Sequence, residues 1–473
     1  MPQPPKKISF PHNILIIGFG SIGQGVLPLI LRHIDIPKEC ITIVTADKRG
    51  KEIAEEYGVT FIIKPLKQNN YQEILKSHLK PGDFLLNLSV DVSTVDLISF
   101  CAENDVLYLD TVIEPWEGGY TDTSIPEAKR TNYALREDAL VLRKKYGTTA
   151  PTAVLTHGAN PGLVSHFVKK ALIHIAKDTG QFTNVPQDRA QWAKLACDLH
   201  IKTIHIAERD TQICNPRKHL GEFVNTWSVD GFVGEGSQPA ELGWGSHEKH
   251  FPPDGKRFDF GCTAAIFLGR PGAATEVRSW TPLAGSQTAF LITHGESISL
   301  ADYFTIGDTK TPTYRPTVHY AYHPSDDTVL SVHEFIGKNF ELQKNKRVVT
   351  DEIVSGIDEL GVLLMGHEKG AYWYGSRLSV EEARRLTPHN SATALQVTAG
   401  VLSGVIWAIK NPRRGVIEPD EMPFDEILRI AKPYLGKVMG EYSDWTPLEN
   451  RNHPLPEDLD ESDPWQFKNF RIT

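Results

Sequence analysis

The stretch ILIIGFGSIG, residues 14–23, decides the fold of the first part of this 473-residue chain. Four apolar residues predict a buried β-strand, and the glycines after it have the spacing G-x-G-x-x-G. In a strand–turn–helix unit, the three glycines allow the turn, close approach to a pyrophosphate and helix–strand packing. The helix N-terminus favours the negative charge. We therefore expect a dinucleotide at Gly18, Gly20, Ser21, Ile22 and Gly23.

An acidic residue at the end of the second predicted strand extends this motif. Asp47 ends the segment ITIVTAD, 24 residues after Gly23, where a carboxylate holds the ribose hydroxyls of the cofactor. A carboxylate there disfavours the 2′-phosphate of NADP, although the neighbouring Lys48 and Arg49 leave that alternative open. We expect NAD.

Strands and helices alternate through the first 150 residues, and the strands are almost entirely apolar. This pattern predicts a Rossmann-type, doubly wound parallel sheet that is covered on both faces. Ligands of such sheets lie at the carboxyl ends of the strands. Further cofactor contacts are therefore expected from residues after the later strands: Ser89, Val90, Asp91, Thr111, Asn160, Pro161 and Gly162.

From about residue 160, short strand-like segments alternate with turns rich in glycine and proline, which predicts a second α+β domain with a mixed or antiparallel sheet. A long helical segment returns near residue 390 and stops at Pro412. We expect an NAD-binding domain over 1–160 and a substrate-binding, catalytic and dimerisation domain over 161–385. Residues 386–473 are expected to pack back on the first domain.

Composition excludes several other classes of protein. The net charge of −9 without a basic cluster argues against a nucleic-acid partner. The five cysteines are scattered, with no C-x-x-C pair, which indicates reduced thiols in the cytoplasm. Apolar runs are too short for a signal peptide or a membrane span. His319 and His323 have the spacing of helical zinc ligands but lie in a strand-like segment, so no metal is expected.

The second domain supplies acidic residues and one aromatic residue in short segments. Glu208, Trp227 and Glu235 lie near predicted strand ends, and the segment THGES adds His294 and Glu296. Carboxylates hold ammonium groups by charge-assisted hydrogen bonds, and a tryptophan ring stabilises a cation above it. The set favours a cationic amine as substrate. Taken singly, each residue could also belong to a surface ion pair or to the core.

Several long segments resemble bacterial homospermidine synthases, in the wider saccharopine-dehydrogenase-like group, and the similarity runs nearly end to end. They are IIGFGSIGQGVLPLI, THGANPGLVSHF, ERDTQ, NTWSVDGFVGEGSQPAELGWG, LITHGES and HNSATALQVTAGVLSGVIWAI. The resemblance implies a homodimeric enzyme that moves a hydride from putrescine to NAD. A second putrescine displaces ammonia from the resulting imine, and the hydride returns to give sym-homospermidine. Spermidine as the aminobutyl donor would release diaminopropane instead.

The resemblance also implies roles for individual residues. Trp227 would face the iminium, while Glu208 and Glu235 would hold ammonium groups and help to move protons. The orienting or proton-relay groups would be Asn160 and His294, with Glu296 as a further amine contact and Glu114 and Glu117 at the amine entrance.

Two other classes of function stay open at this stage. A saccharopine or carboxynorspermidine dehydrogenase joins an amine to a carbonyl acid in an NAD(P)-dependent reduction. Its site would need an arginine or lysine where this sequence offers mainly acids. An NAD(H)-sensing protein would keep the glycine motif and Asp47, but would not need the acids and Trp227.

Overall fold

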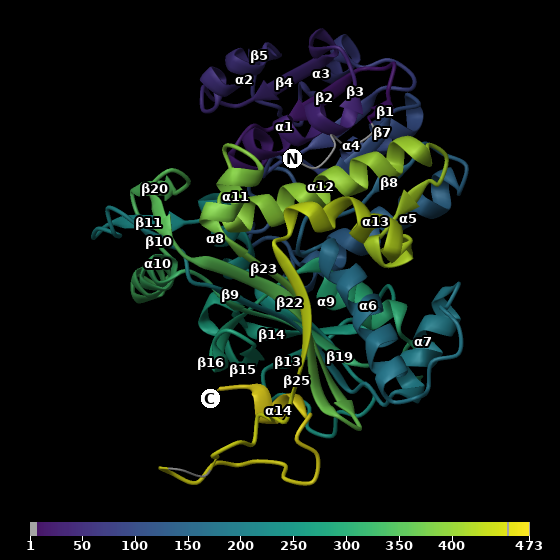
Figure 1. Cartoon of the computed structure of the whole chain (residues 1–473), viewed down its shortest axis with the longest axis vertical. Coiled ribbons are helices and arrows are strands. Elements are labelled where there is room, and N and C mark those ends of the chain that lie inside the picture. Colours follow the sequence, from purple (N-terminus) through teal and green to yellow (C-terminus); the bar gives the residue numbers. More distant parts are fainter. Residues whose placement is uncertain (1–6, 452–453, 473) are drawn as a thin grey trace.

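The computed structural model describes residues 7–451 and 454–472. It contains two large sheets with a long helix, α12 (Ala392–Lys410), between them (Figure 1). The elements of the first sheet and its layers are β2 (Ile14–Ile17), α1 (Ser21–His33), β4 (Ile41–Thr45), α2 (Lys51–Tyr57), β5 (Thr60–Ile63), α3 (Tyr71–His78), β6 (Phe84–Asn87), α4 (Thr94–Glu103), β7 (Leu107–Asp110), α5 (Asn132–Tyr146), β8 (Ala153–Val154) and β24 (Val416–Ile417).

This first sheet has the strand order β24-β8-β7-β6-β2-β4-β5, and every neighbouring pair is parallel. The strands β2, β6 and β7 are buried along their whole length because helices cover both faces. The predicted doubly wound parallel sheet is confirmed. Since the strands are parallel, the residues that follow β2, β6, β7 and β8 meet at one edge.

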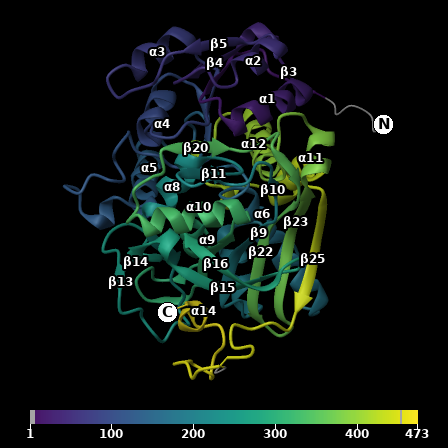
Figure 2. The ribbon, with the colours of Figure 1, turned by 90° about the vertical axis from the view of Figure 1, so that its left-hand side faces the viewer.

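The second sheet is mixed, as predicted, and has ten strands within the described residues. Its elements and those around it are α6 (Leu163–Asp178), α7 (Arg189–Asp198), β9 (Thr203–Asp210), α8 (Val229–Ser237), β12 (Pro239–Gly243), β13 (Gly255–Arg257), β14 (Ala265–Pro271), β15 (Glu276–Thr281), β16 (Gly285–Ile292), α9 (Gly295–Tyr303), β19 (Thr317–His323), α10 (Asp326–Gly337), β22 (Ile357–His367), β23 (Gly370–Ser379), α11 (Val380–Leu386) and β25 (Lys437–Ser443). The main path is β13-β14-β12-β19-β9-β22-β23-β25, and β16 joins β19 and β15. Figure 2 shows β22, β23 and β25 along one side of this domain.

Four small two-stranded sheets lie outside the two large sheets in the described residues. They are β1 (Ile8–Ser9) with β3 (Ile34–Asp35), β10 (Ile213–Cys214) with β21 (Ile353–Ser355), β11 (Glu222–Asn225) with β20 (Asn345–Val348), and β17 (Ile306–Gly307) with β18 (Pro312–Tyr314).

Helix α12 joins the two domains. The hydroxyl of Ser391 caps its N-terminus, and the helix packs on α1, β7, β23 and α13 (Phe424–Ala431). A Cβ at Gly400 would lie 2.0 Å from the carbonyl oxygen of Gly158, so the glycine lets the helix press on the turn that precedes α6. By length and composition α12 could cross a membrane, but 89% of its apolar window is buried within this structure. It is a core helix that holds the 158–162 turn in place.

The C-terminal segment is divided between the two domains, which differs from the prediction that residues 386–473 pack back on the first domain. Strand β24 pairs with β8 of the first sheet, and α12 packs on elements of both domains. Strand β25 instead pairs with β23 of the second sheet. The apolar residues Trp465, Phe467 and Phe470 then pack in a buried apolar cluster with residues of the second sheet. The tryptophan and phenylalanine side chains of this segment bury one face of the second sheet.

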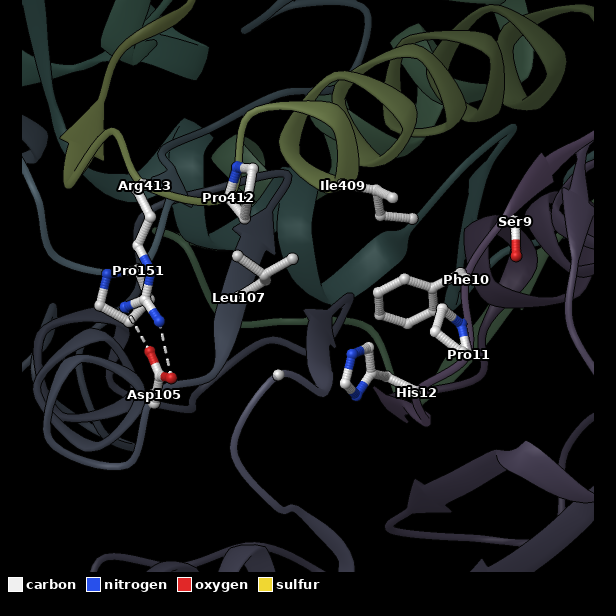
Figure 3. Close-up of a pocket in the computed structure, with 11 residues that line it drawn as sticks. Ser9, Phe10, Pro11, His12, Asp105, Leu107, Pro151, Ile409, Pro412 and Arg413 are labelled. Carbon is white, nitrogen blue, oxygen red and sulfur yellow. Dashed lines mark hydrogen bonds and ion pairs between the residues drawn. The ribbon is translucent and has the colours of Figure 1, made fainter.

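A surface hollow of about 250 Å³ lies at the edge of the first sheet opposite to the one where the strands β2, β6, β7 and β8 end (Figure 3). Gly82, Asp105 and Pro151, which line it, precede β6, β7 and β8, so it lies at the amino ends of the strands. It is lined further by apolar side chains and by Arg413, which pairs with Asp105. Because doubly wound sheets bind ligands at the carboxyl ends, this hollow is not the cofactor site.

Candidate active site

The loop between β2 and α1 has the shape that a dinucleotide needs. Gly18 has a φ of +82°, and a Cβ there would lie 2.8 Å from the carbonyl oxygen of Leu88. A Cβ at Gly20 would meet no atom within 4 Å, so the backbone is open at the N-terminus of α1. A Cβ at Gly23 would lie 2.9 Å from the ring of Phe19. The residues therefore fit a pyrophosphate at Gly20, with the helix N-terminus behind it.

The other residues predicted at the cofactor follow the neighbouring strands. Ser89, Val90 and Asp91 come after β6, and Thr111 comes directly after β7. The hydroxyl of Ser89 donates to the Oδ1 atom of Asn87 over 2.6 Å. The remaining three, Asn160, Pro161 and Gly162, form the turn between β8 and α6. The topology places all of them at the same edge as Gly18, Ile22 and the rest of the glycine motif.

Asp47 follows β4 and already has a partner. Its carboxylate accepts hydrogen bonds from the backbone N–H and the Nε of Arg49, each over 2.8 Å. The hydrogen bond from Arg49 lowers the pKa of Asp47, so the carboxylate is ionised at neutral pH. The position fits an acceptor for ribose hydroxyls, with a guanidinium beside it.

One face of the second sheet carries the acidic residues. Glu208 is on β9, and its register partners are Tyr322 on β19 and Leu360 on β22. Ile292, the last residue of β16, pairs with Tyr320 of β19. His294 comes two residues after Ile292. Because side chains alternate along a strand, the side chain of His294 is on the same face of the sheet as those of Ile292 and Tyr320. Register thus brings His294, Tyr320 and Glu208 together.

Glu208 joins the two domains. Its side chain is 2% exposed, and its Oε2 accepts hydrogen bonds from Nδ2 of Asn160 over 2.9 Å and from the hydroxyl of Tyr320. Burial raises the pKa of Glu208 to about 7, and the charge of Asp210 adds to this effect, while the two hydrogen bonds oppose it. A carboxyl with such a pKa can accept and release a proton near neutral pH.

His294 lies between two carboxylates. Its Nε2 is 3.0 Å from Oε2 of Glu235, in α8, and its Nδ1 is 3.3 Å from Oε1 of Glu296, in α9. All three residues are buried. Burial alone would lower the pKa of His294, but the two carboxylates raise it to about 10. The imidazole is therefore a cation at neutral pH.

Trp227 lies beside the cofactor loop. The hydroxyl of Ser21 donates a hydrogen bond to its backbone carbonyl. A Cβ at Gly231 would lie 2.8 Å from the indole ring, so the glycine makes room for it. The side chain is half-buried and packs against the main core at one side. This placement leaves ring surface available to a ligand that lies between the two domains.

The two residues predicted at the entrance have different positions. Glu114 is buried, and burial raises its pKa well above the ordinary value, with further contributions from the charges of Asp91 and Glu235. Glu117 is exposed. Partial burial and then the charge of Glu117 raise the pKa of Asp91. Electrostatic contacts therefore lead from exposed Glu117 through Asp91 and Glu114 to Glu235.

Sequence reasoning missed three buried polar residues at this site. They are Tyr320, Asp210 and Asp358, and the last two are register partners on β9 and β22. Burial, followed by the charges of Glu208 and Asp210, raises the pKa of Asp358 well above its ordinary value. The alternation of side chains along a strand could have indicated them. Asp210 lies two residues after Glu208 on β9, and Tyr320 lies two residues before Tyr322, the register partner of Glu208.

The histidines that have zinc-ligand spacing in the sequence lie apart in the structure. Over residues 7–451 and 454–472, no three histidine, cysteine or acidic residues gather as metal ligands. His319 turns to the opposite face of the sheet, where its ring packs near Phe467. His323 contacts Arg209 and the carbonyl of Pro324 instead.

The comparisons with known proteins agree with this architecture. Residues 14–154 match the family model "Saccharopine dehydrogenase NADP binding domain", and residues 158–443 match "Saccharopine dehydrogenase C-terminal domain". The fold and site thus define a two-domain protein of the saccharopine dehydrogenase class.

Three individual relatives narrow this class. The chain is 51% identical over 465 residues to homospermidine synthase of Blastochloris viridis, with 97% of each chain covered. It is 50% identical over 466 residues to that of Mesorhizobium japonicum, with 97% of this chain and 96% of the relative covered. The crystal structure of homospermidine synthase from Legionella pneumophila in complex with NAD superposes with a TM-score of 0.93 at 48% identity, over 99% of both chains. The chain belongs to the homospermidine synthase family.

Proposed function

We propose that this enzyme joins two putrescine molecules into sym-homospermidine and releases ammonia, with NAD as a cofactor that is not consumed. The observation that carries the proposal is the junction of the two domains. There, Asn160 of the cofactor edge holds Glu208 of the acidic face, and Ser21 of the glycine loop holds the segment of Trp227.

The cofactor edge supports the assignment of NAD. Gly18 and Gly20 leave room for the pyrophosphate, and Asp47 can accept hydrogen bonds from the ribose. The Legionella pneumophila relative was crystallised with NAD. When bound, NAD supplies reversible hydride transfer at a carbon next to an amine.

The protein's own side chains handle the amines and their protons. Diamines are cationic at neutral pH, and an amine must lose a proton before its carbon can give up a hydride. Glu208, with a pKa of about 7, is suited to accept that proton. Glu235 and Glu296 hold the remaining ammonium groups by charge-assisted hydrogen bonds, and the His294 cation balances their charge.

Trp227 acts on the cation that forms next. Loss of hydride leaves an iminium carbon, which the second amine attacks and from which ammonia leaves. A ring face next to this cation stabilises it by about 2 kcal/mol or more when water is excluded. The burial of Glu208 and His294 indicates such an environment, which also protects the imine from hydrolysis.

Reductive condensation of an amine with a carbonyl acid is the main alternative. Such a substrate carries a carboxylate and needs a free cation in the site. The cation that lies there, His294, has both ring nitrogens engaged by carboxylates. The charge of the site therefore favours a diamine.

A single incubation tests the proposal. Purified enzyme is given putrescine and a small amount of NAD relative to putrescine, and the products are followed by mass spectrometry and absorbance at the NADH band. Homospermidine and ammonia should form in many turnovers without accumulation of NADH. NADH in proportion to product would contradict the proposal, as would a requirement for a keto acid.

We also propose that spermidine can act as aminobutyl donor, which diaminopropane release would test. The predicted homodimer is proposed as well, with light scattering as its test. A cytoplasmic location is supported by the cysteines, all five of which are free thiols in the structure.

A further inference from the structure

Two donors converge on one oxygen atom of Glu208. The hydroxyl of Tyr320 donates to Oε2 over 2.5 Å, and Nδ2 of Asn160 donates to the same atom over 2.9 Å. Within residues 7–451 and 454–472, no side chain or backbone N–H donates a hydrogen bond to Oε1. One oxygen is therefore fixed by the protein, and the other is left for a ligand.

The same tyrosine also touches the charged histidine. The ring centroids of Tyr320 and His294 are 4.4 Å apart, with an angle of 36° between the planes. Tyr320 is 3% exposed, so both contacts are made in a buried environment. Its side chain thus links Glu208 to the group of Glu235, His294 and Glu296.

We propose that Tyr320 is a positioning residue for Glu208: its hydroxyl holds Oε2 so that Oε1 faces the amine, and its ring supports the neighbouring imidazolium. This inference rests on the proposed function. It gives the two oxygens of Glu208 different roles.

Tyr320 also influences when Glu208 is ionised. Removing a donor from a carboxylate destabilises the charged form and raises its pKa. The acidic limb of the rate profile should therefore move to higher pH when the Tyr320 hydroxyl is lost. The titratable, charged and polar groups that face Glu208 are Asp210 on its own strand, Asp358 on β22, Tyr320 and Tyr322 on β19, His294 before α9, and Asn160 after β8.

The test compares Tyr320→Phe with Tyr314→Phe. Tyr314 is buried, and its hydroxyl donates to the carbonyl of Ile201 over 2.8 Å, beyond the amino end of β9 and far along the strand from Glu208. Each variant loses one hydrogen-bonded hydroxyl and keeps its ring. For Tyr320→Phe, we expect kcat/KM for putrescine to fall about 10- to 100-fold. Its acidic limb should move up by about half a pH unit or more, whereas Tyr314→Phe should change neither.

Two further measurements keep the test decisive. Putrescine binding in the presence of NAD, followed by calorimetry across pH, should show the same shift without any turnover. A 3-fluorotyrosine in place of Tyr320 is a stronger donor and should move the limb the other way, which covers the case in which Tyr320→Phe does not fold.

The possible failures are distinguishable. If the unmodified enzyme makes no homospermidine, the proposed function fails, while calorimetry still reports on Tyr320. If the enzyme is active but the acidic limb stays in place in Tyr320→Phe and with 3-fluorotyrosine, the positioning role is wrong. An equal shift in Tyr314→Phe would also overturn it.

Discussion

Replacing His294 with glutamine would remove the cation that lies between Glu235 and Glu296. In the folded protein the pKa of His294 is about 10, compared with 6.5 for an ordinary histidine. At about 1.4 kcal/mol for each tenfold change in proton affinity, this difference corresponds to roughly 5 kcal/mol. The folded pKa is raised, so this stabilisation is complete below pH 6.5 and is lost as the pH rises through 10.

The assay is urea denaturation at pH 6, 8 and 10 of the unmodified protein, His294→Gln and the control His219→Gln. His219 is exposed. We expect His294→Gln to reduce the apparent free energy of unfolding by about 3–5 kcal/mol at pH 6, because two buried carboxylates lose their cation. The difference should become smaller towards pH 10, and the control should stay within about 0.5 kcal/mol. A difference that does not change with pH would refute the reasoning.

Substitutions at three further positions test separate parts of the site. At Trp227, homospermidine formation should decrease in the order Trp, Phe, Leu at nearly constant melting temperature, since a ring over a cation is worth about 2 kcal/mol; normal activity of Trp227→Leu would exclude the cation role. Glu208→Gln keeps the shape but cannot accept a proton, so turnover should fall strongly while circular dichroism is unchanged; a parental rate would exclude Glu208 as the base. Asp47→Ala should weaken NAD binding, measured by calorimetry, by roughly 1–3 kcal/mol and improve binding of NADP relative to NAD, because Arg49 loses its partner; unchanged affinities would show that Asp47 does not hold the ribose.

The first domain could be predicted well from the sequence because its signals are local. The apolar strand, the glycine spacing and the acidic residue at the next strand end all lie within residues 14–47. Each part has one structural reason, and the parts agree with one another. The parallel topology then places later strand ends at the same edge with no further information.

The acidic site could be predicted only as a set of residue types. Glu208 and Asn160 are 48 residues apart, and Glu235 and His294 are 59 residues apart. Such pairings depend on the register of β9, β16 and β19, which no local pattern determines. The sequence could therefore indicate a site for cations, but not which carboxylates are neutralised by a histidine.

The sequence pattern around Tyr320 did not indicate a role for this residue at the site. In HYAYH, residues 319–323, the histidines attract attention as possible ligands, and the tyrosines resemble core residues. Alternation along β19 sends Tyr320 to the face of Glu208 and His319 to the other face. The C-terminal tail was misplaced for a related reason, because nothing in its composition indicates which of two sheets β25 will extend.

The structure separates two kinds of carboxylate in one small space. Glu235 and Glu296 share the His294 cation in a buried environment. Glu208 is held by the neutral donors Asn160 and Tyr320, and burial leaves its pKa at about 7. The two environments suit different tasks: carboxylates beside a cation can bind ammonium groups, and a carboxyl with a pKa of about 7 can exchange a proton. In the proposed reaction a diamine needs both kinds, since one nitrogen must stay protonated for binding while the other loses its proton for chemistry. On this proposal, a single base acts on a substrate whose two ends are chemically identical.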